Sequence, residues 1–408
     1  MTTSAQAGLR KGSAPRLGQD YTLLWVGQFL SMSGTWIQYI ALPLWVLHET
    51  GSGLASGLTF AVETLPIVVL APWAGVLADR YDRRRLVLVG ELLSVGIVLA
   101  LVGAVALGSV PGALVCAAAI KAINTVTVPA LQGMLRQVVS EAALPAAVSR
   151  FEGLTGATVV LGPPVGALLF ATVGPTFALL VNAASFAVSA LCFAMMRIRR
   201  AAPIARTGTS PRPRLGGGFA LVRSSPRMRA LLTAEAAYFL CFGGSTAAVI
   251  VAATEQLGEA RAGWYPASVG AAWVVISMLV LPKSKWTPRT SLLLGAAFIP
   301  LTAMAITVRG VAPLALLVAA GVLGGVANSL IAAGASIGWQ KAADSSMIGQ
   351  VMALRRCVAN GALALSSAVL PALAQIYSVG PVLLVGSLAA TSLVCLCLTG
   401  WSRQEAKS

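Results

Sequence analysis

Residues 75–107 read GVLADRYDRRRLVLVGELLSVGIVLALVGAVAL. A stretch dense in arginine is followed at once by an apolar run, from Leu86 to Leu107, that contains one charged residue, Glu91. A helix needs about 20 predominantly apolar residues to cross the hydrocarbon core of a bilayer, which is about 30 Å thick. The stretch therefore predicts one membrane-spanning helix that begins at a basic loop.

Similar runs recur along the 408 residues, of which 57% are hydrophobic and only 10% charged. A soluble domain carries roughly 25% charged residues, and backbone groups in lipid must bond within their own helices. We therefore predict an all-α membrane protein with twelve transmembrane helices in two six-helix bundles. The predicted spans cover residues 21–47, 54–78, 86–107, 112–135, 153–172, 175–196, 230–253, 263–282, 290–308, 312–336, 352–376 and 380–401.

A polar stretch that contains Pro203, Pro211 and Pro213 separates the sixth run from the seventh. Prolines and glycine runs of this kind interrupt helices, so the stretch is predicted to be a linker in the cytoplasm. The predicted segments are a cytoplasmic amino-terminal tail (1–20), a first bundle (21–196), the cytoplasmic linker (197–229), a second bundle (230–401) and a cytoplasmic carboxy-terminal tail (402–408).

Lysine and arginine are distributed unevenly about these spans. With the amino terminus in the cytoplasm, 26 of the 29 lie on the cytoplasmic side, Arg261 and Arg309 lie outside, and Lys121 lies within a helix. Membrane proteins concentrate basic residues on the cytoplasmic side. We therefore interpret the formal charge of +16 as a sign of orientation in the inner membrane, with both termini cytoplasmic and no nucleic-acid partner.

The sequence offers few groups for catalysis or for holding a metal. His48 is the only histidine, and the six cysteines lie in or beside apolar runs. No Gly-x-x-x-x-Gly-Lys-Ser/Thr loop is present to cradle a nucleotide. We expect no enzyme activity, no cofactor, no metal site, no disulfide and no removable signal peptide.

The loop between the second and third spans carries a specific motif, with Gly75 followed by Asp79 and Arg80, and then by Arg83 and Arg84. It resembles the signature loop of the major facilitator superfamily. The glycine permits close helix approach, and the acid can face a helix dipole or neighbouring arginines. These residues would form a latch between the two halves, and the alternative is a solvated basic turn.

The fifth span carries Gly153, Gly156, Gly162, Pro163 and Gly166. This pattern resembles the one that the superfamily's exporters carry in their fifth helix, and it favours export over import. Small residues allow close helix packing, and proline bends the segment, which would seal one face of a cavity. Ordinary tight packing with a kink is the alternative.

Further segments extend the resemblance to the drug/proton antiporter branch that contains macrolide and enterobactin exporters. It is weaker in the second half, where Gln350 stands at the place of an arginine, and Arg355 or Arg356 could substitute for it. The segments of the first half that carry it are 31–41, 128–137 and 182–186.

The resemblance implies alternating-access export of small amphipathic or drug-like molecules, with protons as the coupling ion. An importer or symporter of a metabolite, or a non-transporting receptor, remains the alternative. The residues themselves specify no cargo.

Ionisable groups at membrane depth are costly and suggest function. Glu63 and Lys121 each lie nine residues from the predicted outer face, roughly 14 Å deep at about 1.5 Å per residue. An ion pair between them is predicted, either as a site for proton and substrate or as a permanent bridge. Glu235 is a second proton or substrate candidate, with an exposed vestibule residue as the alternative. We expect neighbouring arginines to neutralise Glu91.

Aromatic and polar side chains are predicted to line a cavity with apolar walls and a few orienting groups. The candidates are Trp36, Tyr39, Asn124, Tyr238 and Phe242.

Overall fold

The computed structural model describes residues 18–197, 219, 222–240, 244–281, 287–307, 313–342 and 348–405. Within these ranges every regular element is a helix, which confirms the all-α prediction. Several predicted features lie outside the described residues. They are most of the tails and of the linker, Phe242, the surroundings of Gly75, and the side chains of Asp79 and Gln350.

The first half contains the six long helices that the apolar runs predict. Their ends are set by local chemistry: Gly51 ends the first helix in a left-handed conformation with φ 63°, and the Ser52 side chain caps the next by accepting from the Ala55 amide. The helices are α1 (Gln19–Thr50), α2 (Gly53–Arg80), α3 (Arg83–Ala106), α4 (Val110–Val138), the short η1 (Glu141–Ala143), α5 (Leu144–Val173) and α6 (Pro175–Met195).

The second half contains more interruptions. The predicted seventh span is divided, because α8 ends at Tyr238 and α9 begins at Ser245, where the Gly244 amide donates to the Ser366 hydroxyl at 2.9 Å. The elements are α8 (Pro226–Tyr238), α9 (Ser245–Leu257), α10 (Glu259–Ala262), α11 (Trp264–Val275), the π-helix η3 (Ile276–Val280), α12 (Pro288–Thr307), α13 (Pro313–Ala342), α14 (Ile348–Tyr377) and α15 (Val379–Glu405).

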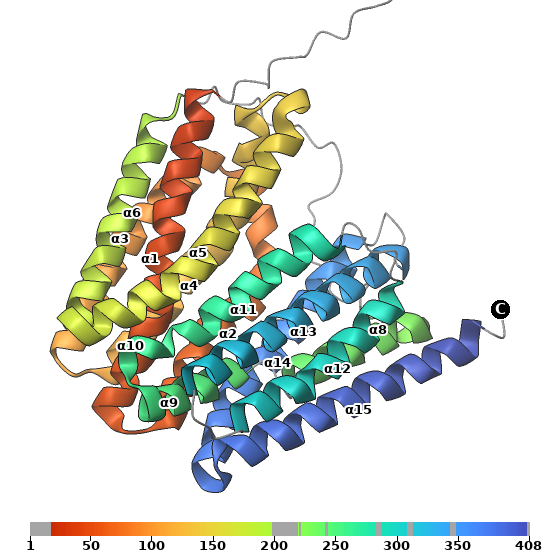
Figure 1. The fold of residues 1–408 in the computed structure, drawn as a ribbon. Coiled ribbons are helices and arrows are strands. Elements are labelled where there is room, and N and C mark those ends of the chain that lie inside the picture. Colours follow the sequence, from red (N-terminus) through yellow and green to blue (C-terminus); the bar gives the residue numbers. More distant parts are fainter. Residues whose placement is uncertain are drawn as a thin grey trace, which may run out of the picture.

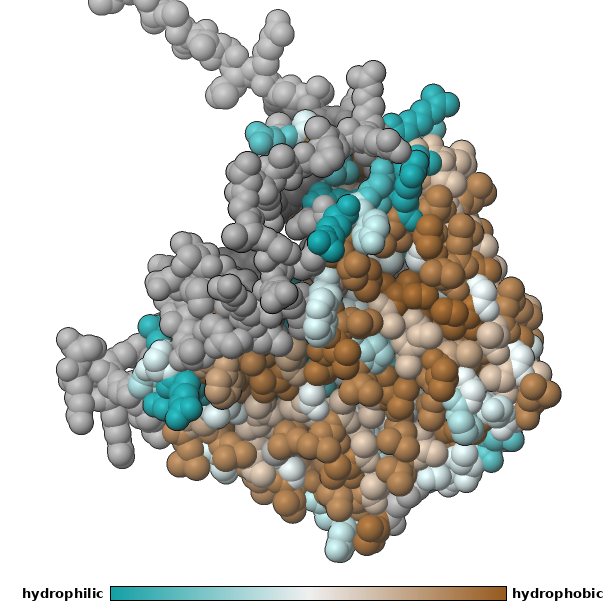
Figure 2. Space-filling model, turned by 180° about the vertical axis from the view of Figure 1, so that it is seen from behind, coloured by the Kyte–Doolittle hydropathy of each residue, from teal (hydrophilic) through white to brown (hydrophobic). Residues whose placement is uncertain are grey.

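Nine helical segments within the described ranges are long and apolar enough to cross a membrane. The helices α1 and α12 and the pair α8 and α9 occupy the places of the other three predicted spans. Large apolar side chains such as Val115, Leu191 and Leu396 are exposed on the helices. Figure 2 shows such apolar side chains over most of one face, as expected for a surface in contact with lipid.

The two halves repeat one pattern of helix packing, although their sequences showed no clear internal repeat. In the first half α1 packs on α6, and α3 packs on both α4 and α6; in the second half α8 packs on α15, and α12 packs on both α13 and α15. Figure 1 shows the halves side by side, with α1 to α6 on the left. Contacts between the halves join α2 to α14 and α5 to α10 and α11.

The buried apolar core is shared at one end of the molecule and divided at the other. At the end that contains Gly51 and Gly258, one cluster combines residues of both halves, among them Ile40, Phe60, Ile250 and Tyr265. At the opposite end, which contains Arg83, the described residues form two clusters, one within each half. We name these the joined end and the basic end; in Figure 1 the halves diverge towards the basic end, at the top.

Candidate functional site

The predicted ion pair between Glu63 and Lys121 is present. Packing of α2 on α4 brings the Lys121 Nζ to 3.7 Å from the Glu63 Oε2, which is ion-pair distance but longer than a hydrogen bond. Glu63 is buried, with 7% of its surface exposed, whereas the Lys121 side chain is 25% exposed. Both residues lie within segments that could span a membrane. The pair is therefore a charged site that is partly open on the lysine side.

Aromatic rings lie beside this pair. The Tyr39 ring makes edge contacts with Trp36 and with Phe60, at centroid distances of 5.0 and 4.9 Å. Tyr39 also lies close to Glu63. Asn124 is half-buried and follows Lys121 by three residues on α4, and therefore lies on the same side of that helix. Five predicted residues thus lie close together, namely Trp36, Tyr39, Glu63, Lys121 and Asn124.

Glu235 forms a second buried site, with a partner that the sequence analysis did not assign. The Arg355 guanidinium reaches both of its carboxylate oxygens, at 2.7 to 2.9 Å, and the Trp339 indole donates to Oε2 at 3.3 Å. Glu235 is 3% exposed, so its interpretation as an exposed vestibule residue is wrong. An arginine inside the predicted run 352–376 was the signal that could have identified the partner.

Tyr238 follows Glu235 by one helical turn but faces a different partner. Its hydroxyl donates to the Asn328 Oδ1 at 3.3 Å, and its ring lies edge-on to Phe239 at 5.2 Å. The residue is 4% exposed. It therefore packs inside the second half in this conformation.

Arginines of the predicted latch bond within the first half. The Arg84 Nε donates to the Phe193 carbonyl at 2.8 Å and its Nη2 donates to the Ala194 carbonyl, which satisfies the last turn of α6. The Arg83 guanidinium lies against Gly133 on α4, and Arg80 is exposed. These contacts stabilise the first half in this conformation, and the latch between the two halves stays a prediction.

Glycines of α5 place that helix against two neighbours. A Cβ on Gly166 would lie 2.7 Å from the Ile37 carbonyl oxygen on α1, and one on Gly162 would overlap Trp36. Towards the second half, Gly156 receives the Val274 side chain of α11, and Pro163 contacts Gly263. The predicted close packing is thus confirmed at the glycines that face α1 and α11.

Glu91 does not meet the arginines that were expected to neutralise it. Its Oε1 accepts from the Ser31 hydroxyl at 3.2 Å, and the residue is buried with 8% exposed. The expectation was wrong because the residue faces α1, away from the basic loop.

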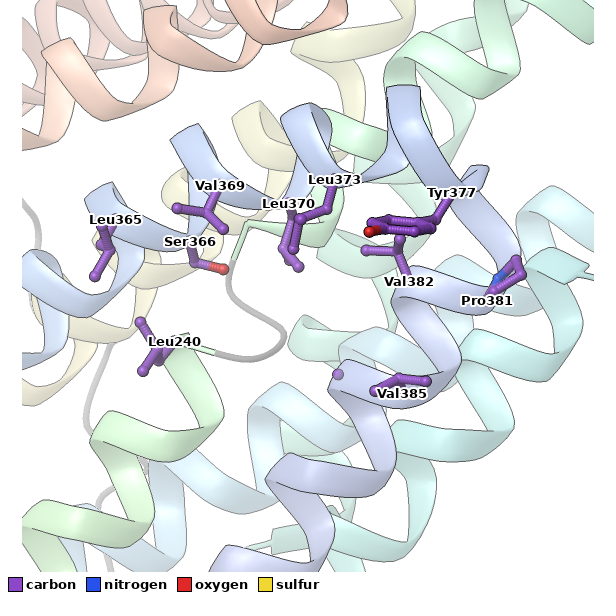
Figure 3. A pocket seen from close by; sticks show the side chains of 11 residues that line it. Leu240, Leu365, Ser366, Val369, Leu370, Leu373, Tyr377, Pro381, Val382 and Val385 are labelled. Carbon is purple, nitrogen blue, oxygen red and sulfur yellow. The ribbon is translucent and has the colours of Figure 1, made fainter.

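A separate apolar pocket of about 590 Å³ lies between α14, α15 and the end of α8 (Figure 3). Leu240, Leu365, Val369 and Val385 line it and are themselves exposed. The hydroxyl groups in its lining belong to Tyr377 and Ser366, and the Ser366 hydroxyl accepts a hydrogen bond from the Gly244 amide. Trp36, Tyr39, Asn124 and Tyr238, which were predicted to line the cavity, do not line this pocket.

Two six-helix repeats that share a core at one end, with an acid–base pair buried within the membrane span, define a polytopic membrane transporter. The chain belongs to the major facilitator superfamily, because the family model described as "Major Facilitator Superfamily" matches residues 24–367.

Curated relatives of this chain carry transporter names. An uncharacterized MFS-type transporter, YfiS of Bacillus subtilis, is 26% identical over 63% of this chain and 62% of its own length. The multidrug efflux pump Tap of Mycolicibacterium fortuitum is 27% identical over 41% and 43%. Macrolide efflux protein A of Streptococcus pyogenes is 25% identical over 44% of each chain. The chain thus matches less than two thirds of the length of each.

Solved structures agree in fold alone. A point mutant of the nucleoside transporter NupG gives a TM-score of 0.79 at 10% identity and covers 93% of this chain and 99% of its own. A bacterial homologue of the iron transporter ferroportin, in an inward-facing state, gives 0.72 at 17% identity and covers 93% and 98%.

Proposed function

We propose that this protein is a secondary exporter of small amphipathic or drug-like molecules that is driven by proton entry. The observation that carries the proposal is the buried Glu63–Lys121 pair, 3.7 Å apart, beside the Trp36 and Tyr39 rings. The names of the relatives, multidrug and macrolide efflux proteins, support the direction and the kind of cargo.

The pair provides minimal chemistry for exchange. When the Glu63 carboxylate takes up a proton it loses its charge, and the Lys121 ammonium loses the partner that holds it. A substrate that interacts with the same two groups then competes with the proton. Because the proton and the substrate use one site, binding of one promotes release of the other. A coupling free energy therefore links the binding of the two ligands.

The divided core supports an alternating-access cycle. The basic end carries the arginines of the loop between α2 and α3, and the positive-inside rule places that end in the cytoplasm of an inner-membrane protein. The conformation described is then open towards the cytoplasm and closed at the joined end. The tails and the linker belong on the cytoplasmic side, with the domain boundaries as the sequence predicts them.

The aromatic rings supply the apolar part of the site. Trp36, Tyr39 and Phe60 present ring faces and edges next to one carboxylate and one ammonium. Such a surface binds molecules that combine an aromatic or aliphatic body with a polar or charged group.

The test uses inside-out vesicles with an acidic interior and a pH-sensitive dye. Amphipathic cations, anions and neutral compounds are added to vesicles with wild-type protein, Glu63→Gln protein or no protein. We expect some compounds to discharge the gradient with the wild type and not with Glu63→Gln. Glu255→Gln is the matched control, because the same change is made at an exposed carboxylate on α9.

Discharge by no compound, with folded and inserted protein, would rule out proton antiport for the compounds tested. Substrate accumulation in right-side-out vesicles would instead establish import. Binding without flux in either orientation would establish a receptor.

A further inference from the structure

A polar seam runs between α1 and α6 in the first half. The Asn182 Nδ2 donates to the Gln38 Oε1 at 2.7 Å, and the Ser185 hydroxyl fills the space opposite Gly34. One step towards the basic end, Ser31 on α1 and Ser189 on α6 lie on either side of Glu91, which enters from α3. The seam thus holds a carboxyl group apart from the Glu63–Lys121 pair.

Two atoms of this cluster lack partners among the described residues. The Glu91 Oε2 and the Ser189 Oγ are both buried and neither makes a hydrogen bond of good geometry, although the two side chains are close enough to interact. Ser189 is 0% exposed and Glu91 is 8% exposed. Buried polar atoms are normally bonded, so two adjacent exceptions require an explanation.

Among the described residues, the charged groups on the helices around Glu91 are bonded to other partners or lie away from it. Within its described range α6 carries no Asp, Glu, Lys or Arg, and Cys192 is its only titratable side chain. On α1, residues 21–47 include no such charged residue and are titratable only at Tyr21 and Tyr39.

On α4, Lys121 is paired with Glu63 of α2, and Cys116 lies beyond Lys121 along the helix. At the beginning of α3 itself, Arg84 is bonded to carbonyls of α6 and Arg85 is exposed, while Arg83 lies against Gly133. The remaining charged groups on α2 and α4 are Asp79 and Arg136, whose side chains lie outside the described residues, and the exposed Arg80.

A proton would resolve both exceptions at once. An ionised carboxylate only accepts hydrogen bonds, and a buried one without a cation is costly. A carboxylic acid with its proton on Oε2 becomes a donor, and the Ser189 hydroxyl beside it becomes its acceptor. The same proton also removes the buried charge, which a hydrogen bond from Ser189 to an ionised carboxylate would leave in place.

We propose that Glu91 is a proton-binding site, held as a carboxylic acid between Ser31 and Ser189 in this conformation. When the seam between α1, α3 and α6 loosens during the transport cycle, the O–H bond breaks, the proton passes to water and the carboxylate is hydrated. This second site deepens the proposed function, on which its role in coupling rests, and it assigns α3 a part in coupling.

Infrared spectroscopy of the protein in liposomes tests the proton directly, without any substrate. We expect the carbonyl band of a protonated carboxyl group at neutral pH in the wild type, its loss in Glu91→Gln, and its retention in Glu63→Gln. Ser189→Ala should shift the band, because a hydrogen bond is lost. Ser329→Ala, a buried serine on α13 in the other half, should leave it in place. A spectrum unchanged by Glu91→Gln would overturn the proposal.

The vesicle assay tests coupling separately. Glu91→Gln should lower the number of protons exchanged per substrate while substrate still moves, whereas Glu63→Gln should abolish the exchange. An unchanged proton count would overturn the role in coupling. If no compound discharges the gradient in any variant, the proposed antiport fails, and the infrared band still decides whether Glu91 binds a proton.

Discussion

The guanidinium of Arg355 on α14 binds both carboxylate oxygens of Glu235 on α8, across 120 residues of sequence. This two-oxygen geometry is the strongest that arginine makes with a carboxylate. With the Trp339 indole as a further donor, the pair fixes α14 to α8 and α13. Because α14 also packs on α2, the pair helps to position a contact between the two halves.

Arg355→Ala should destabilise the protein strongly. The change leaves a buried carboxylate without its cation, and breaking a buried pair in this way costs about 3–5 kcal/mol. Thermal unfolding in detergent measures the effect. Arg356→Ala is the matched control, because Arg356 is the adjacent residue and is exposed, and it should change the midpoint little. Equal losses for the two variants would show that the pair does not anchor α14.

Removing both charges of the Glu63–Lys121 pair should separate its structural role from coupling. Lys121→Met leaves Glu63 buried without its partner, so its level of folded protein should fall. The double variant Glu63→Gln/Lys121→Met should recover that level, because no unpaired charge remains. It should still fail to exchange protons for substrate in vesicles. Normal exchange by the double variant would mean that the pair is a permanent bridge.

Gly166→Ala should be poorly tolerated and Gly153→Ala should be harmless. A Cβ at residue 166 would lie 2.7 Å from the Ile37 carbonyl oxygen and 2.9 Å from its Cα, and backbone atoms cannot move aside. A Cβ at residue 153 would meet nothing within 4 Å. Overpacking costs about 1–3 kcal/mol, and the midpoint of thermal unfolding reports it. A similar midpoint for both variants would argue against tight contact between α1 and α5.

Cross-linking at the joined end should arrest transport. The His48 Nδ1 of α1 lies 3.8 Å from the Glu259 Oε1 of α10, so these positions connect the halves at the rim. Cysteines at both positions, in a background without the natural cysteines, should react with a cleavable bifunctional thiol reagent. Transport should stop after the reaction and return when the linker is cut, and either single cysteine should be unaffected. Full transport by the linked protein would show that this end need not open.

Helix number and the depth of charges followed from simple regularities of the chain. Apolar length gives the spans, and the fixed rise of a helix places Glu63 and Lys121 at equal depth, so their meeting could be predicted. The division of the seventh span could not, because residues 230–253 form one continuous apolar run whose central glycines, Gly243 and Gly244, are compatible with a helix. The Gly244 amide, just before α9, donates to Ser366, which is distant in sequence.

Partners across helices were less predictable than depth. Arg355 lies inside the predicted span 352–376 and was considered only as a substitute for the arginine that Gln350 replaces, whereas on α14 it binds Glu235. Glu91 was associated with the arginines nearest to it in sequence, whereas the rotation of α3 turns it towards Ser31. In both cases the contact depends on how the helix is rotated about its own axis. Hydropathy does not predict this rotation when all faces of the helix are apolar.

The contact between α5 and α11 consists of side chains that enter the spaces above glycines on the opposite helix. Val274 enters at Gly156, Val159 enters at Gly270, and Pro163 rests on Gly263. The atoms nearest to these three glycines include no charged group. Dispersion therefore supplies the interaction energy of this contact, and that energy changes gradually as one helix rotates on the other. In the proposed transport cycle, such a contact would let one helix rotate on the other while the two halves stay at one separation on this side, with no discrete bond to break at each turnover.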